Sequence, residues 1–258
     1  IYIPKEIIMD IVNTFIYDND IRIKATLLKN SLRELFKAQS MPKDKTSLFS
    51  KAALLAATFA TEEKDDNGAI YVSIKDPNTK TALTAVCETD GRLRGCVDVY
   101  KDSSFSETVL TVGRKLAIRG DYQSSVIGKD IEVAAEEYFK SSRQTKAKIK
   151  FFTFEDSDGF IFSEYFPGHN VNFQDENKKP TPEYLSKKLE TALETAIEAT
   201  IKNRSIDILK KVSTTKIIFG CTCSKRRIKH ALSQTHDLTF PVEIKCRFCG
   251  KNYIIDSL

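Results

Sequence analysis

The sequence predicts an α+β fold that ends in a small metal-binding tail. Strand-like segments occur in runs interrupted by helices, an order that favours a mixed α+β domain over a doubly wound sheet. An amphipathic helical stretch follows the strands, and four of the six cysteines crowd into the last 38 residues. We therefore expect an N-terminal α+β domain, an amphipathic helical linker and a C-terminal zinc-binding domain, at residues 1–174, 175–215 and 216–258.

Composition narrows the class of protein, its partners and its cellular compartment. Its 258 residues can bury a sizeable core, and no run of 18 apolar residues suggests a membrane span. The net charge of +5 is weak evidence for a nucleic-acid partner. Clustered cysteines suit a metal site in a reducing compartment. Residues 1–5 do not resemble a signal peptide, so we expect a cytoplasmic protein, or an organellar one if a targeting peptide has been removed.

Apolar periodicity and turn signals predict the first elements. Residues 21–27 predict a strand, and residues 32–36 lie in a short helix that ends before the breaker cluster at 41–44. Apolar side chains at helical spacing predict a longer helix over about 47–62, with Ser47 as its N-cap. This helix is apolar enough to occupy the centre of the domain.

Period-two patterns predict the strands that follow. These strands are expected at residues 70–75, 82–88, 93–100, 147–154 and 160–166. A helix near residues 130–142 separates the first three of these strands from the last two.

Asp90-Gly91 lies between two alternating apolar runs and predicts a hairpin, because a type I′ turn needs positive φ angles. Across that turn Cys87 is expected to face Arg94, which makes Cys96 its diagonal neighbour on the same face. Diagonal pairs lie roughly 7–8 Å apart at Cα, too far for an easy disulfide. Cys87 and Cys96 are therefore interpreted as buried or half-buried thiols.

A loop-like stretch at residues 168–182 precedes the helical linker. Apolar residues between Leu185 and Ile201 recur at steps of three and four and form one stripe. Residues 203–205 break this helix, and a short helix is expected at 206–212. Two interpretations stay open: an ordinary core helix, or a linker helix that docks on the domain and detaches under some signal.

The most specific motif is the pair Cys221-Thr-Cys223 and Cys246-Arg-Phe-Cys249. Zinc is held tetrahedrally by four thiolates at about 2.3 Å, and each short pair can form one edge of that tetrahedron. We therefore predict that these four cysteines bind one Zn²⁺ ion. Four thiolates complete the coordination, so the histidines between the two pairs are interpreted as surface residues.

This zinc site is either purely structural or one that comes apart on oxidation. A disulfide between residues i and i+2 departs from relaxed geometry, so it should form under strong oxidant and be reduced readily. The tail is too small to bury a core of its own, and zinc contributes roughly 10–16 kcal/mol to folding in finger-sized units. Metal loss should therefore unfold the tail. Arg226, Arg227 and Arg247 would offset the negative charge of the thiolates.

Motifs for nucleotide-binding or hydrolytic enzymes do not occur, and the chain has only three histidines, His169, His230 and His236. We therefore expect no enzyme. A zinc-ribbon nucleic-acid binder is the main alternative, because the tail is basic and phosphate contacts give salt-dependent affinity. A CxxC thiol oxidoreductase is disfavoured, since this pair lies between strand-like segments 242–245 and 253–255 rather than in a βαβ unit.

Four segments resemble one known family. Residues 219–227 (FGCTCSKRR) and 246–253 (CRFCGKNY) are similar to the zinc motifs of the 33-kDa heat-shock protein family of redox-regulated holdase chaperones. Residues 90–95 resemble the G-R-x-R-G turn of that family, and residues 136–142 resemble its E-x-Y-F-x-x-S helix. The resemblance covers most of the chain and is most specific in the tail.

This resemblance implies an ATP-independent chaperone that is inactive while reduced and zinc-bound. The implied ligands are Cys221, Cys223, Cys246 and Cys249, and the implied disulfides on oxidation are Cys221–Cys223 and Cys246–Cys249. Zinc would leave, the tail and linker would unfold, and apolar surface would bind unfolding client proteins. A homodimer is one candidate state of the active form, and neither a membrane nor a nucleic acid is expected as a partner.

The sequence also departs from the family pattern. Arg143 stands where the family usually has Glu, although Gln144 keeps the next position. The stretch from Cys223 to Cys246 is short, and two further thiols, Cys87 and Cys96, are not part of the switch of the family.

Overall fold

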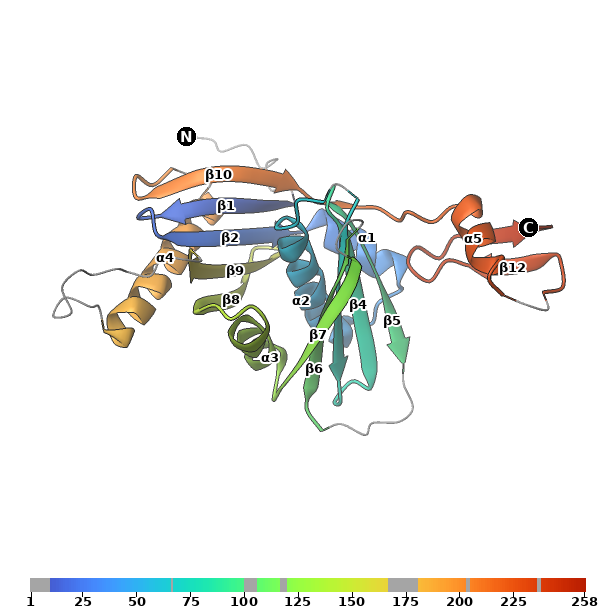
Figure 1. Cartoon of the computed structure of the whole chain (residues 1–258), viewed down its shortest axis with the longest axis horizontal. Helices are drawn as coiled ribbons and strands as arrows, with labels where there is room; N and C mark the ends of the chain where they lie inside the picture. The colour runs from blue at the N-terminus through green and yellow to red at the C-terminus, as the bar shows by residue number, and fades with distance from the viewer. Residues whose placement is uncertain are drawn as a thin grey trace.

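Two mainly antiparallel sheets pack around helix α2 (Lys43–Ala60), and a separate tail carries the clustered cysteines (Figure 1). This computed structural model describes residues 10–65, 67–99, 106–116, 120–166, 181–202, 205–235 and 238–258. The arrangement confirms the predicted α+β fold, with a helical linker and a small C-terminal unit.

In the described part of the chain, five strands form the first sheet in the order β10-β1-β2-β9-β8, with antiparallel neighbours. Their bounds are β1 (Ile11–Tyr17), β2 (Ile21–Leu28), β8 (Ala147–Phe154), β9 (Ser157–Tyr165) and β10 (Leu209–Lys216). The short helix expected at 206–212 is wrong, because residues from Leu209 onward pair with β1. The β-branched side chains of Val212, Thr214 and Thr215 suit that strand.

The second sheet has the order β11-β5-β4-β3-β6-β7 among the described residues. Its strands are β3 (Ala69–Asp76), β4 (Thr81–Glu88), β5 (Arg92–Val99), β6 (Thr108–Leu116), β7 (Gly120–Gly128) and β11 (Ile218–Phe219). Helix α3 (Ile131–Glu137) and a π-helical turn (Tyr138–Ser142) follow β7, where the sequence predicts a helix. Strand β11 joins β5 in parallel, so the chain leaving the first sheet enters the second at once.

The β4–β5 hairpin is confirmed, but its predicted register is wrong by one residue. Cys87 lies opposite Leu93, and Cys96 lies opposite Thr84. The turn has a positive φ of 89° at Gly91 and none at Asp90, so the residue-for-residue pairing of a type I′ turn does not apply. Because successive side chains alternate between faces, Cys87 and Cys96 lie on opposite faces of the sheet. Both thiols are buried, as predicted.

Helix α2 forms the centre of the molecule. Nearly every side chain from Phe49 to Ala60 is buried, because the helix is apolar on all sides and has a sheet on each flank. The helix begins at Lys43 after Pro42, four residues earlier than predicted, so Ser47 lies inside it rather than at its N-cap. Helix α1 (Asn30–Ala38) packs beside it.

Helix α4 (Pro182–Lys202) covers the face of the first sheet that points away from α2 (Figure 1). Its apolar stripe, predicted from the sequence, packs on buried residues of β1, β2 and β9. The sheet residues in this cluster are Phe15, Tyr17, Ile21, Ile23, Ala25 and Ile161, together with Leu209 of β10. In the described ranges no helix is long and apolar enough to cross a membrane.

Candidate metal centre

The four predicted ligands come together in the tail, from two separate segments. Cys221 and Cys223 follow β11, whereas Cys246 and Cys249 lie in the turn between β12 (Val242–Lys245) and β13 (Asn252–Ile255). All four Sγ atoms lie within 4.8 Å of one another.

The distances between sulfurs fit a tetrahedral ion. The Sγ atoms of Cys221 and Cys246 are 3.6 Å apart, and those of Cys223 and Cys249 are 3.5 Å apart. Four thiolates at about 2.3 Å from one zinc ion would lie about 3.8 Å from one another. Among the described residues, these cysteines are the group placed to bind a metal. The donor set of four soft sulfurs suits zinc.

The β12–β13 hairpin shapes the second cysteine pair. The backbone N–H of Cys246 donates to the Lys251 carbonyl at 2.8 Å, and the N–H of Gly250 donates back to the Cys246 carbonyl at 2.8 Å. Gly250 has a φ of +72°, a left-handed conformation that glycine adopts without steric cost. Both sulfurs of the pair are therefore held on the same side of a tight turn.

Helix α5 (Lys225–Leu232) begins immediately after the first cysteine pair. The Ser224 side chain accepts a hydrogen bond from the Arg227 N–H at 3.2 Å and caps the helix. Arg227 also donates to the Thr222 carbonyl at 3.0 Å, so it ties the loop between the two ligands to α5. His230 is exposed on α5 and outside the sulfur cluster, as predicted, whereas His169 and His236 lie outside the described residues.

Tyr253 supports the ligand Cys223 from β13. Its hydroxyl is 3.0 Å from Cys223 Sγ and donates to the Cys223 carbonyl at 3.2 Å, while its ring is buried. The single O–H of Tyr253 is within reach of both acceptors of Cys223, and a hydrogen bond to the sulfur would stabilise and orient a thiolate ligand. The role of this residue was not predicted, although Tyr253 is the aromatic residue that ends the second zinc motif.

The thiols do not lose their protons equally. Burial alone would raise the pKa of Cys223, but hydrogen bonds from Tyr253 and the neighbouring thiols outweigh it and lower this pKa to about 7. Burial and proton sharing raise the pKa of Cys221, and burial raises the pKa of Cys249. One thiolate therefore forms near neutrality, and the charge of a bound Zn²⁺ would draw the remaining protons from the site.

Comparison with known proteins identifies the family of this chain. A family model described as Hsp33 protein matches residues 10–256. The chain belongs to the Hsp33 family. Among solved structures, the crystal structure of the 33 kDa chaperonin (heat shock protein 33 homologue) of Thermotoga maritima is similar, with a TM-score of 0.64 and 17% identity. The match covers 95% of this chain and 94% of that one, and it supports the fold. No curated protein sequence matches the chain.

The structure explains the two glycines of the Hsp33-like G-R-x-R-G turn. A Cβ atom on Gly91 would lie 2.3 Å from the carbonyl oxygen of Lys216, at the end of β10. A Cβ on Gly95 would lie 2.7 Å from both the Phe49 ring and the Thr84 carbonyl oxygen. Both glycines therefore permit close packing, and Gly91 lets the linker cross the hairpin on its way to the tail.

Arg143, which departs from the Hsp33 pattern, lies in the body rather than near the metal centre. Its guanidinium binds Glu62 through two nitrogens, at 2.5 and 3.2 Å, and contacts Glu164 at 3.2 Å. Burial alone would raise the pKa of Glu62, but Arg143 outweighs it and lowers that pKa. Arg22 also pairs with both carboxylates, so two arginines and two glutamates balance one another in this cluster.

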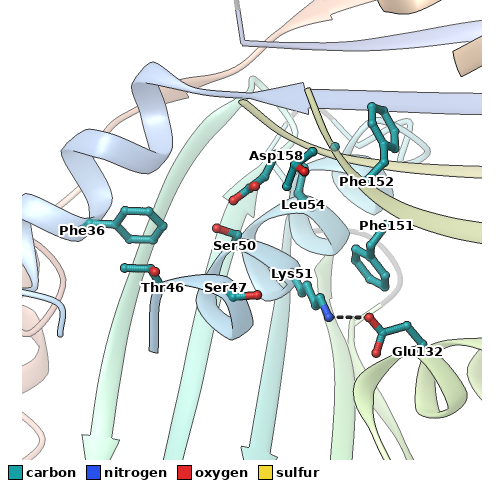
Figure 2. A pocket seen from close by; sticks show the side chains of 12 residues that line it. Phe36, Thr46, Ser47, Ser50, Lys51, Leu54, Glu132, Phe151, Phe152 and Asp158 are labelled. Carbon is teal, nitrogen blue, oxygen red and sulfur yellow. Dashed lines mark hydrogen bonds and ion pairs between the residues drawn. The ribbon is translucent and has the colours of Figure 1, made fainter. Parts of the chain in front are cut away.

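A pocket of about 430 Å³ lies between α1, α2, α3 and the β8–β9 hairpin, away from the cysteines (Figure 2). Phenylalanines from α1 and β8 line it together with hydroxyl groups of α2, and Figure 2 shows Lys51 reaching across to Glu132. This mixed lining adds no ligand to the metal centre, so the pocket and the sulfur cluster are separate features.

Proposed function

We propose that this Hsp33 family member is a redox-switched, ATP-independent holdase in the cytoplasm, inactive while its four cysteines hold Zn²⁺. The observation that supports this proposal is the placement of the sulfur cluster. It lies in a small tail, and the segment that leads into this tail forms an edge strand of each sheet. Helix α4 covers the apolar outer face of the first of these sheets. The resemblance to a solved 33 kDa chaperonin agrees with this assignment.

The switching chemistry is a four-electron oxidation of the ligands. Two molecules of hydrogen peroxide oxidise four thiolates to two disulfides, with uptake of four protons and formation of four water molecules, and Zn²⁺ leaves. The proposed pairs are Cys221–Cys223 and Cys246–Cys249. The closest sulfurs belong instead to opposite pairs, so each cysteine must change its side-chain direction as the metal departs.

Loss of the metal would unfold the tail. Among its described residues, from Cys221 onward, only Tyr253 and Ile255 are buried hydrophobic side chains. Two buried side chains and a two-stranded hairpin cannot offset the conformational entropy of some 40 residues. The tail therefore depends on metal coordination for its folded state.

The surface that would receive clients lies under α4. Leu189, Leu193 and Ala196 of this helix pack on the apolar outer face of the first sheet. Detachment of α4 would expose that face, and contiguous exposed apolar surface binds unfolded chains. A homodimer of the oxidised form would bury part of this surface between two copies.

The test combines three measurements on zinc-loaded protein treated with peroxide at raised temperature. We expect release of one zinc ion and loss of four thiols, mass-spectrometric detection of disulfides within each pair, and suppression of the aggregation of a heat-unfolded enzyme without ATP. Reduced protein serves as the control. Zinc release without any suppression of aggregation would exclude the holdase, and sedimentation of the oxidised form reports its oligomeric state.

A further inference from the structure

The loop between Cys246 and Cys249 contacts the body of the molecule through its two inner residues. The Arg247 guanidinium donates to Cys96 Sγ from Nε at 3.2 Å and from Nη2 at 3.1 Å. Nη2 also lies 2.5 Å from a carboxylate oxygen of Asp98. Cys96 and Asp98 are two residues apart on β5, so their side chains share one face of the strand.

The second inner residue, Phe248, extends this contact. Gln39, at the end of α1, donates from Nε2 to the carbonyl oxygens of Arg247 and Phe248, at 3.0 and 2.9 Å. The guanidinium groups of Arg94 and Arg247 lie 5.3 and 5.7 Å from the centre of the Phe248 ring, within the range of cation–π attraction. We call Gln39, Arg94, Cys96 and Asp98, together with Arg247 and Phe248, the docking contact.

We propose that the docking contact couples the metal centre to the body, so that the metal-bound loop docks and docking in turn retains the metal. This inference rests on the proposed zinc site. Both carbonyls that Gln39 binds belong to residues flanked by metal-ligating cysteines, so their direction depends on the coordinated shape of the loop. Coupling is reciprocal: if zinc strengthens docking by some factor, docking strengthens zinc binding by the same factor.

The reactivity of the Cys96 thiol toward an alkylating reagent can report this coupling. It is only 1% exposed, with Arg247 of the tail as a direct contact. Cys87 is 0% exposed on the opposite face of the same hairpin, inside the main core. Undocking should uncover the thiol of Cys96 and leave Cys87 protected, whereas unfolding of the body would expose both.

The decisive variant changes the body and leaves every residue of the tail intact. We combine Gln39→Ala with Asp98→Asn in reduced, zinc-loaded protein and measure zinc transfer to a colorimetric chelator and alkylation of each cysteine by peptide mapping. We expect the zinc affinity, measured from the zinc distribution at equilibrium with the chelator, to fall by about fivefold or more, the lower range of coupling between sites. Alkylation of Cys96 should rise and that of Cys87 should not.

The matched control is Gln123→Ala with Asp121→Asn, which makes the same two chemical changes at exposed residues of β7, separated from β5 by three strands at the other edge of the second sheet. A second experiment removes zinc from the wild-type chain under anaerobic reducing conditions, and we expect faster alkylation of Cys96. Wild-type zinc affinity in the Gln39→Ala/Asp98→Asn variant, or a Cys96 that stays protected without zinc, would overturn the coupling. Neither experiment uses a client protein or an oxidant, so its result is independent of holdase activity.

Discussion

At the scale of single residues, the candidate metal centre involves more than its four cysteines. The Tyr253 hydroxyl contacts both the sulfur and the carbonyl of Cys223, so it fixes the position of one ligand. Groups that orient metal ligands typically change metal affinity by about 10- to 100-fold when they are removed. Tyr253 is therefore part of the site, because it positions Cys223.

We expect Tyr253→Phe to retain zinc but to release it about tenfold faster to a competing chelator, because the ring stays in place and the hydrogen bonds are lost. Tyr184→Phe is the control, since Tyr184 is exposed on α4. An unchanged release rate in Tyr253→Phe would show that the hydroxyl does not support Cys223.

Lys24 makes a second prediction at this scale. It is buried, its Nζ donates to the Thr61 carbonyl and hydroxyl at 3.1 and 2.8 Å, and burial lowers its pKa to about 8. The unfolded chain keeps this proton up to about pH 10.4. Between these values the unfolded state binds more protons, so the contribution of Lys24 to stability rises with pH.

Lys24→Met should remove that contribution. As the pH rises from 8 to 10.4, we expect the free energy of unfolding of wild type to increase relative to that of Lys24→Met by up to about 3 kcal/mol. Urea unfolding at several pH values measures it, with Lys37→Met as the exposed-lysine control. A pH-independent difference would contradict the lowered pKa.

The clustering of the four cysteines could be predicted from sequence, because a CxC pair followed by a CxxC pair is spacing typical of a zinc site. Tyr253 and the partners of Arg247 could not, because hydrogen bonds between residues far apart in sequence depend on the fold. The prediction that Cys87 and Cys96 share one face of the hairpin was wrong for a related reason. The register of the hairpin is set by the conformation of its turn, and one residue of register moves a side chain to the other face.

At the scale of elements, the sequence predicted several of those with strong periodicity, but strands β1 and β6, whose burial also alternates, were not predicted. Helices α2 and α4 and the strands of the β4–β5 hairpin form where their apolar patterns lie. Strand β7 is largely exposed and so lacks a clear alternation, and it was not anticipated. Strand β10 was mistaken for a helix because its stability comes from pairing with β1 rather than from its own pattern.

Helix α4 allows a test of the proposed client surface. Leu193 is 4% exposed against the first sheet, and truncation of a buried leucine costs about 2–5 kcal/mol. We expect Leu193→Ala to detach α4 and to suppress client aggregation while the protein is still reduced and zinc-loaded. Hydrogen exchange over residues 182–202 checks detachment.

Glu194→Ala is the matched control, because Glu194 is the exposed neighbour of Leu193 on the same helix. Faster exchange of α4 in Leu193→Ala without any chaperone activity would show that this sheet face does not bind clients.

At the scale of the whole molecule, the metal centre and α4 lie at opposite ends (Figure 1). In the proposed switch, a signal from zinc loss would pass along residues 209–219, which carry β10 and β11. Ile217 lies between these strands, is buried, and donates its N–H to the Asp10 carbonyl at 2.8 Å. This segment is the covalent route between the two ends, and the docking contact is a second, non-covalent link from the tail to the body.

Removing zinc from the reduced protein with a chelator should reveal which elements unfold when the metal is lost. We expect fast hydrogen exchange from residue 221 to the end of the chain, a partial loss of protection in β11 and β10, and full protection in α2, whose core the tail does not share. Re-addition of zinc is the control for reversibility. Loss of protection in α2 would mean that the body, too, requires the metal.

The short segment around Ile217 has one more consequence. It closes the open side of two different sheets, since β10 lies at the margin of one and β11 at the margin of the other. If it departs, β1 and β5 become unpaired edge strands, with backbone donors and acceptors free for strand addition. An extended stretch of an unfolding protein could then bind by β-augmentation, which reads backbone rather than side chains and so accepts many sequences.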